Sequence, residues 1–230
     1  MYKVKLVIAG LFSVLAVVTL VSQRYVMACA AVQFLDYEEV APDIFISPGI
    51  ENVSKILEII LEARERVGVT FGPMMSSPRI ILTARREEAA RLGANSTATT
   101  HYIPLGACIV LAPKGQNVDV AAHELVHAEV GYRVGWLTHW LEIPVWFNEG
   151  VALIIDQRSS FLVDNINVNQ ATIETVKQLN TGREFFSGDN VHRNYLASRL
   201  AVEAIEHSNV YEKLALIRSG KSFDSVFEIL

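Results

Sequence analysis

The sequence predicts an α+β fold, with a small mixed sheet and its helices in the first half of the chain and helices alone in the second. Three observations lead to this prediction. Short apolar runs alternate with helical periodicity up to residue 111. After residue 170, apolar residues recur only at helical spacing, with glycines between the runs. Finally, 230 residues are enough for one domain with its own core and a terminal appendage.

An appendage at residues 1–30 precedes the domain, which we expect to span residues 36–230. Its apolar run, Leu6–Val21, carries no charge and follows Lys3 and Lys5. As a helix the run would be roughly 24 Å long, slightly less than the roughly 30 Å hydrocarbon core of a bilayer. We interpret the appendage as a signal anchor or a signal peptide. Both place the domain on the extracytoplasmic side, periplasmic or extracellular.

Two interpretations of the appendage stay open. A signal anchor would remain in the membrane with its amino end inside, as the positive-inside rule predicts. A cleavable signal would use the small-x-small site Ala28-Cys29-Ala30, and Val26-Met27-Ala28-Cys29 loosely resembles a bacterial lipoprotein cleavage box. Arg24, between the apolar run and this site, is unusual in cleaved signals, so we favour the anchor. Cys29 and Cys108 either form a disulfide in the exported chain or remain two separate thiols.

Glycine, proline and small polar residues bound the expected elements. Strands are expected at 43–47, 79–83 and 107–111, and helices at 50–67, where Gly68 marks the end, and at 87–92. Residues 96–102 form either another strand or a flexible rim. The C-terminal helices are expected at about 171–180, 191–207, 209–219 and 222–229.

The clearest chemical pattern is His123-Glu124-Leu125-Val126-His127. Residues four apart lie on one face of a helix, so two imidazoles can bind one metal ion. Glu124 remains free to hold a water beside that ion as general base. Zinc binds neutral imidazole and carboxylate, and a catalytic zinc keeps one position open, so one downstream Glu would complete the protein ligands.

A second motif, Trp146-Phe147-Asn148-Glu149-Gly150-Val151-Ala152, resembles the W-L-N-E-G-F-A segment of membrane alanyl aminopeptidase-type enzymes. The two motifs together, from His123 to Ala152, resemble the gluzincin zinc metallopeptidases, including the peptidase MA-like domains. This resemblance implies a zincin-like fold in which His123, His127 and Glu149 bind Zn²⁺ and Glu124 is the catalytic base. Glu129 and Glu142 are the alternative third ligands. Glu129 follows His127 by two residues and so points away from it on a helix.

The chain departs from these enzymes at two places. The aminopeptidase type carries a G-x-M-E-N segment whose acid binds the free amino terminus. Here Pro104–Cys108 has no acid, which favours an endopeptidase. Thermolysin-like gluzincins place an Asp four residues after the ligand Glu, where this chain has Leu153. The hydrogen-bond partner of a zinc histidine must therefore come from elsewhere, and Asp119 and Asp156 are possible.

The resemblance also implies where a substrate would bind. By position, Ala107–Leu111 would be the strand along which gluzincins bind the substrate backbone; the alternative is an ordinary buried strand. Gluzincins place a Tyr or His on a downstream helix to stabilise the oxyanion. Tyr195 is the first candidate and His192 the second, although Tyr195 could equally be a packed core residue.

Three tryptophans, Trp136, Trp140 and Trp146, lie close together around His139. We favour a core position for them over a lid, a substrate wall or a surface near a bilayer. His139 is expected in a loop with its ring nitrogens satisfied, and not as a metal ligand.

Taken together, these observations predict an exported, membrane-tethered zinc endopeptidase whose substrates are peptides or proteins. The net charge of −5 gives no reason to expect a nucleic acid partner. The main alternative is a membrane-tethered, non-catalytic binding domain on a peptidase-like scaffold. A weaker alternative is the hydrolysis of a non-peptide amide.

Overall fold

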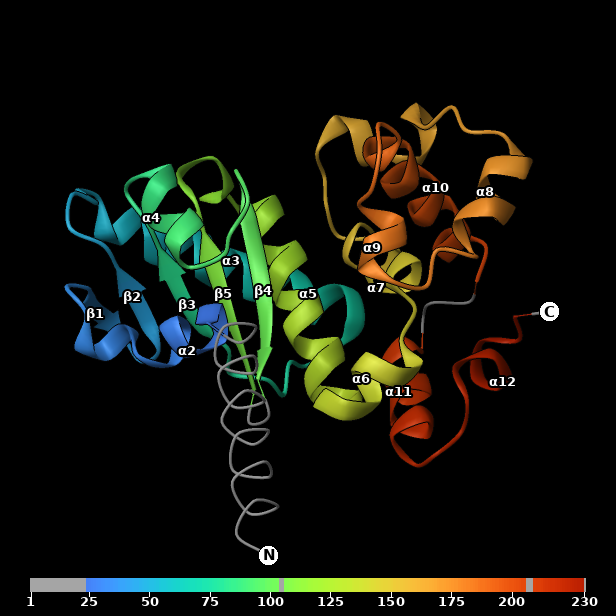
Figure 1. Ribbon diagram of the computed structural model, residues 1–230, viewed down its shortest axis with the longest axis horizontal. Helices are drawn as coiled ribbons and strands as arrows, with labels where there is room; N and C mark the ends of the chain where they lie inside the picture. Colours follow the sequence, from blue (N-terminus) through green and yellow to red (C-terminus); the bar gives the residue numbers. More distant parts are fainter. Residues whose placement is uncertain (1–23, 104–105, 206–208, 230) are drawn as a thin grey trace, which may run out of the picture.

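The computed structural model describes residues 24–103, 106–205 and 209–229 and contains a five-stranded sheet with helices around it (Figure 1). The strand order is β1-β2-β3-β5-β4. The inner pairs β2–β3 and β3–β5 are parallel, and the outer pairs β1–β2 and β4–β5 are antiparallel. The strands are β1 (Glu38–Ala41), β2 (Ile44–Ile46), β3 (Arg79–Leu82), β4 (Ala98–Ile103) and β5 (Gly106–Leu111). The prediction of an α+β fold with a small mixed sheet is confirmed.

The position of β5 corrects one expectation. β5 lies between β3 and β4, and its residues from Ala107 to Leu111 are all buried, so it is not an edge. The edge strand on this side is β4, whose residues after Ala98 are only half-buried. The physical reason lies in composition. An uninterrupted apolar strand is stable where both of its faces are covered, whereas the threonines, histidine and tyrosine of β4 tolerate the exposure of an edge.

Helix α3 (Val53–Phe71) links β2 to β3 and covers one face of the sheet. Its buried residues, Ile56, Ile60, Ala63 and Val67, recur at helical spacing. The side chain of Asn52 caps its first turn. The expected end at Gly68 was wrong, because the helix continues to Phe71 and ends at Gly72, whose φ of 98° favours glycine.

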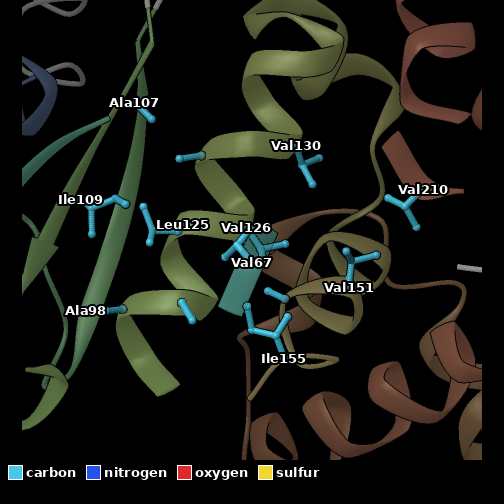
Figure 2. Close-up of a cluster of buried hydrophobic side chains, with 14 of the residues drawn as sticks. Val67, Ala98, Ala107, Ile109, Leu125, Val126, Val130, Val151, Ile155 and Val210 are labelled. Atoms are coloured by element: carbon cyan, nitrogen blue, oxygen red, sulfur yellow. The ribbon is translucent and has the colours of Figure 1, made fainter. Parts of the chain in front are cut away.

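Helix α5 (Val118–Val134) packs beside α3 on the same face and is buried on both of its own sides (Figure 2). In Figure 2, Leu125 faces Ile109 of β5, while Val130 points to the side where Val151 and Val210 lie. A helix that is apolar all round is a core helix. Helix α5 therefore joins the sheet to the C-terminal helices.

The opposite face of the sheet is covered by α2 (Arg24–Ala30) and α4 (Arg86–Arg91). Cys29 and Cys108 form a disulfide that fastens α2 to β5, which answers the question the sequence left open. Arg79 also donates hydrogen bonds to the carbonyl oxygens of Cys29 and Ala30. Residues 24–30 thus belong to the packed domain. The apolar run Leu6–Val21 lies outside the described residues, and no helix within them is long and apolar enough to cross a membrane.

The second half of the chain is helical, as predicted. Its α-helices are α6 (Trp136–Glu142), α7 (Val145–Ala152), α8 (Gln170–Val176), α9 (Gly182–Phe185), α10 (Val191–Glu203), α11 (Val210–Arg218) and α12 (Phe223–Phe227). The expected helices at 171–180 and 191–207 are shorter in the structure. Of the tryptophans, only Trp146 is in the core; Trp136 and Trp140 are exposed, so the expectation of a buried cluster was wrong for these two.

Helices α7 and α10 approach each other closely at Gly150. A Cβ added at Gly150 would lie 2.5 Å from the Ser198 carbonyl oxygen and 2.5 Å from a methyl group of Val202. Only glycine allows this distance, because backbone cannot move aside as a flexible side chain can. Gly150 follows Glu149 directly, so the crossing also fixes the position of that carboxylate.

Gly150→Ala should therefore lower the free energy of unfolding by about 1–3 kcal/mol, as overpacked core substitutions do. The matched control is Gly68→Ala, in the interior of α3, where an added Cβ meets nothing within 4 Å. This control should be neutral or raise stability by about 0.5–1 kcal/mol. Urea unfolding of the full chain in detergent measures both. Equal stability of Gly150→Ala and the unmodified chain would show that α7 and α10 do not cross this closely.

Candidate metal centre

Helix α5 presents two imidazoles to the interior. The side chain of Asn117 caps it by accepting a hydrogen bond from the Val120 amide. Asp119, in the first turn of the helix, pairs with Arg66 at 2.6 Å. His123 and His127, one turn apart, are both buried, and their Nε2 atoms lie 3.1 Å apart. The helix therefore holds two donor atoms at one point.

Helix α7 brings a carboxylate to the same point. Its anchors are Trp146 and Phe147, which pack against Phe223 and Phe227 of α12. Oε2 of the buried Glu149 lies 3.4 Å from His123 Nε2 and 3.5 Å from His127 Nε2. The three side chains thus converge as a buried His-His-Glu group that could hold a metal ion.

The spacing of these three atoms fits a bound ion. Tetrahedral ligands about 2.1 Å from a zinc ion are roughly 3.3–3.5 Å from one another. The three separations in the structure, from 3.1 to 3.5 Å, are close to that range. Two imidazole nitrogens and a carboxylate oxygen are also a donor set that zinc accepts. The residues present therefore fit a divalent metal.

The rival third ligands lie elsewhere. The carboxylate of Glu129 is fully buried and accepts hydrogen bonds from the Met75 and Ser76 amides and from Arg133. It points away from the histidines, as its spacing from His127 predicted. Glu142 ends α6 and is exposed. Among the described residues, Glu149 is the carboxylate grouped with both histidines.

Glu124 is buried beside this group, and its carboxylate accepts a 2.6 Å hydrogen bond from the Thr100 hydroxyl. Thr100 lies on the edge strand β4, so the proposed base and the edge strand are in direct contact. Sequence reasoning missed Thr100, because its link to Glu124 depends on which strand takes the edge position.

Asp156 is the acid nearest to the outer nitrogen of a histidine of the group. Its Oδ2 lies 4.0 Å from His123 Nδ1, beyond hydrogen-bond distance. Arg158 binds both oxygens of Asp156. Of the two acids that the sequence suggested as partners of a histidine, Asp156 is therefore placed beside the site, while Asp119 is occupied by Arg66.

Charge is strongly coupled within the group. Burial alone would raise the pKa of Glu149, but His127 and His123 outweigh it and lower that pKa to about 2. Burial alone would lower the pKa of His127, yet the Glu149 carboxylate reverses this and raises it to about 9. In the absence of metal, the ionised Glu149 is thus balanced by a protonated His127.

Helix α10 borders the site with both candidate oxyanion donors. Tyr195 and His192 line a cavity of about 400 Å³ together with His123, Glu124 and Arg158. His192 is exposed and Tyr195 half-buried. Burial, reinforced by the carboxylates of Glu149 and Glu124, raises the pKa of the Tyr195 hydroxyl. This hydroxyl therefore stays protonated and can donate a hydrogen bond.

A second polar cluster contains Asn148, the neighbour of Glu149 in sequence. Asn148 donates a 3.1 Å hydrogen bond to the Tyr102 hydroxyl, and the rings of Tyr102 and His139 lie 4.1 Å apart. Burial, with a contribution from His127, lowers the pKa of His139 to about 4, so it is neutral. His139 lies in helix α6 and not in the expected loop. Sequence reasoning missed this cluster, because its members come from three distant segments.

The chain has no significant match among known protein families, curated proteins or solved structures.

Metal binding should depend on pH through His127. The pKa of His127 is about 9, above its ordinary value of 6.5, so the metal-free protein holds this proton at neutral pH and must release it to bind metal. Affinity should rise by about tenfold per pH unit up to pH 9 and then level off. Titration of chelator-treated protein against a chromophoric chelator measures this. Glu149→Gln removes the charge that raises the pKa, so in the metal-free variant the His127 imidazole should lose its proton at lower pH, as NMR titration would measure. An affinity that stays constant between pH 7 and 9 would contradict the coupling.

Proposed function

We propose that this protein is a zinc-dependent peptidase, an endopeptidase, that hydrolyses peptide bonds outside the cytoplasm. The observation that carries the proposal is the convergence of His123, His127 and Glu149, with the carboxylate of Glu124 beside them and outside the ligand set. A structural metal site is closed by a fourth protein ligand, whereas a catalytic site leaves that position open. The described residues supply three ligands, and one of them, His123, lines a cavity together with Glu124. This arrangement supports catalysis over a purely structural role.

Zinc is the metal we propose, held by His123, His127 and Glu149. Two imidazoles and one carboxylate form a mixed nitrogen and oxygen set, whereas magnesium and calcium prefer oxygen alone. When bound, zinc would lower the pKa of a coordinated water toward 7 and polarise the carbonyl of the scissile bond.

The remaining steps belong to the side chains of this chain. Glu124 accepts a proton from the attacking water and then donates it to the leaving amine. The Thr100 hydroxyl, which donates to the Glu124 carboxylate, fixes the orientation of this base. Tyr195 donates a hydrogen bond to the oxyanion that forms at the carbonyl, with His192 as the second candidate. The protonated state of Tyr195 supports this role.

The edge strand supports a peptide as substrate. Within the described part of the chain, β4 pairs with β5 and has no strand on its other side. An extended peptide can add to such an edge through main-chain hydrogen bonds, whatever its side chains. Because Thr100 of β4 contacts Glu124, a peptide bound there would pass the proposed base.

Two hollows near the metal centre support cleavage within a chain. One is the cavity lined by His123, Tyr195 and Arg158. The other is lined by Tyr102, whose hydroxyl binds Asn148 next to Glu149, and by Gly131. An endopeptidase must bind residues on both sides of the scissile bond, and we propose that these two hollows provide the space.

The disulfide supports an exported, membrane-anchored protein. Disulfides persist in oxidising compartments, and Cys29–Cys108 lies in the packed sheet. Cleavage after Ala30 would remove Cys29, and lipidation of Cys29 would consume its sulfur. Either event would be incompatible with this disulfide. We therefore propose that Leu6–Val21 is retained as a membrane anchor.

Glu124→Gln should keep the metal and lose about 10²–10⁴-fold in turnover of an unfolded protein substrate, because general-base catalysis contributes that much. Glu149→Ala should lose metal, whereas the matched control Glu142→Ala, at an exposed position, should keep both metal and activity. Elemental analysis and a chelator-sensitive protease assay measure these properties. Unchanged turnover in Glu124→Gln would exclude it as the base. A folded, metal-loaded chain that cleaves nothing would instead favour a non-catalytic binding domain.

The two candidate oxyanion donors can be separated by single substitutions. Tyr195→Phe should lower kcat by about 10²–10³-fold with little change in KM, because an oxyanion donor acts in the transition state. His192→Ala, on the same helix and exposed, should lower kcat far less. A larger loss of kcat in His192→Ala than in Tyr195→Phe would assign the role of oxyanion donor to His192. Full activity in both variants would leave the oxyanion to another donor.

A further inference from the structure

Helix α6 exposes a continuous apolar surface. Its exposed side chains are Trp136 (47 %), Leu137 (54 %), Trp140 (76 %) and Leu141 (61 %), and Tyr132 (43 %) at the end of α5 is next to them in sequence. We call these five residues the α6 surface. Single exposed apolar residues are ordinary, but a contiguous group of them on a solvent-exposed face marks a binding surface.

The spacing of these residues shows that the exposure is one-sided. Trp136 and Trp140 are four residues apart, as are Leu137 and Leu141, so both pairs follow the same stripe of the helix. His139, off this stripe, packs on the ring of Tyr102. Helix α6 therefore turns its polar ring inward and its largest apolar side chains outward, the reverse of an ordinary surface helix.

The α6 surface lies at the end of the sheet beside the last residues of α2. The hollow beside Cys29 and Ala30 of α2 is lined by Ile103, the last residue of β4, and Gly106, the first residue of β5. The same two residues line the hollow that contains Tyr132 and Trp136. These two strand ends therefore lie between α2 and the α6 surface. In Figure 1, α2 and α6 both lie toward the lower end of the sheet.

The tether between the apolar run and this end of the domain is short. Only Ser22 and Gln23 separate Leu6–Val21 from Arg24, where α2 begins. Even fully extended, three residue steps span only about 10 Å. Helix α2 itself is held to the sheet by the Cys29–Cys108 disulfide. If the run is the anchor proposed above, the tether and the length of α2 together keep this end of the sheet within roughly 20 Å of the bilayer.

We propose that the α6 surface docks into the interfacial layer of the bilayer that holds the N-terminal anchor. Tryptophan rings and leucines suit this layer, where apolar groups reach the acyl chains and indole nitrogens stay near water. Between Tyr132 and Leu141 the only charged residue is Arg133, and its guanidinium is bound to Glu129. Arg218, exposed beside Trp136 in the same hollow, faces the headgroup phosphates. As a helix, Leu6–Val21 would be slightly shorter than the hydrocarbon core of the bilayer. This mismatch would draw the domain onto the bilayer surface.

Tryptophan fluorescence of the full chain, reconstituted in phosphatidylcholine–phosphatidylglycerol vesicles, tests this proposal. The chain has three tryptophans, and the buried Trp146 provides a constant background. Vesicles with brominated acyl chains should quench emission of the unmodified chain, and the W136F/W140F variant should lose most of that quenching. Both substitutions are at exposed positions and leave the core unchanged.

The control places a tryptophan away from the α6 surface. Leu162 is 44 % exposed and lies between two short 3₁₀ helices, at 159–161 and 163–165, that are remote from α6 in Figure 1. In W136F/W140F/L162W the new tryptophan should be quenched by aqueous acrylamide and not by brominated lipid. If acrylamide quenches the emission of Trp140 and brominated lipid does not, the proposal is overturned. Protection from both quenchers together with cross-linked dimers would also overturn it, and would assign the surface to a second copy.

Resistance of the chain to alkaline extraction from the vesicles reports on the anchor separately. Protease activity reports on the metal centre. The proposal for the α6 surface can therefore fail while the proposed function holds, and the reverse is equally distinguishable.

Discussion

The ionised carboxylate of Glu149, buried between two imidazoles, is the interaction around which this structure is organised. An isolated buried charge costs several kcal/mol, so it is stable only when its partners are held in place. His123 and His127 are held by α5, which is fixed to the sheet, and Glu149 by α7, which is fixed to α10 at Gly150 and to α12 through Phe147. The packing of both halves of the domain thus determines the distance of 3.5 Å between His127 Nε2 and Glu149 Oε2.

Helix α5 also explains why the centre lies where the two halves of the domain meet. One side of the helix packs on the sheet and the other on the C-terminal helices (Figure 2). The histidines and Glu124 are on the part of this helix that borders the edge strand β4 and the cavity lined by α10. The site therefore draws on the sheet for an edge and on the helices for Glu149 and Tyr195. Neither half contains the complete group by itself.

Some features followed from local pattern, and others did not. Helical spacing indicated that His123 and His127 share a face and that Glu129 points away. It did not show that α3 would continue through Gly68, because a glycine within a helix is tolerated when packing on both sides stabilises the helix. Apolarity placed Trp146, Trp136 and Trp140 together in the core, yet only Trp146 is covered there.

The sequence by itself determined the α+β class, the two histidines with their adjacent Glu124, and Glu149 as the preferred carboxylate. These follow from composition and from spacings of a few residues along one helix, together with the motif that Glu149 belongs to. Only the tertiary structure decided that β4 and not β5 is the edge strand, that Thr100 contacts Glu124, and that Asp156 and not Asp119 lies beside His123. Each of these depends on contacts between segments distant in the chain. Such contacts are selected by how whole faces pack, and periodicity within one segment carries no information about them.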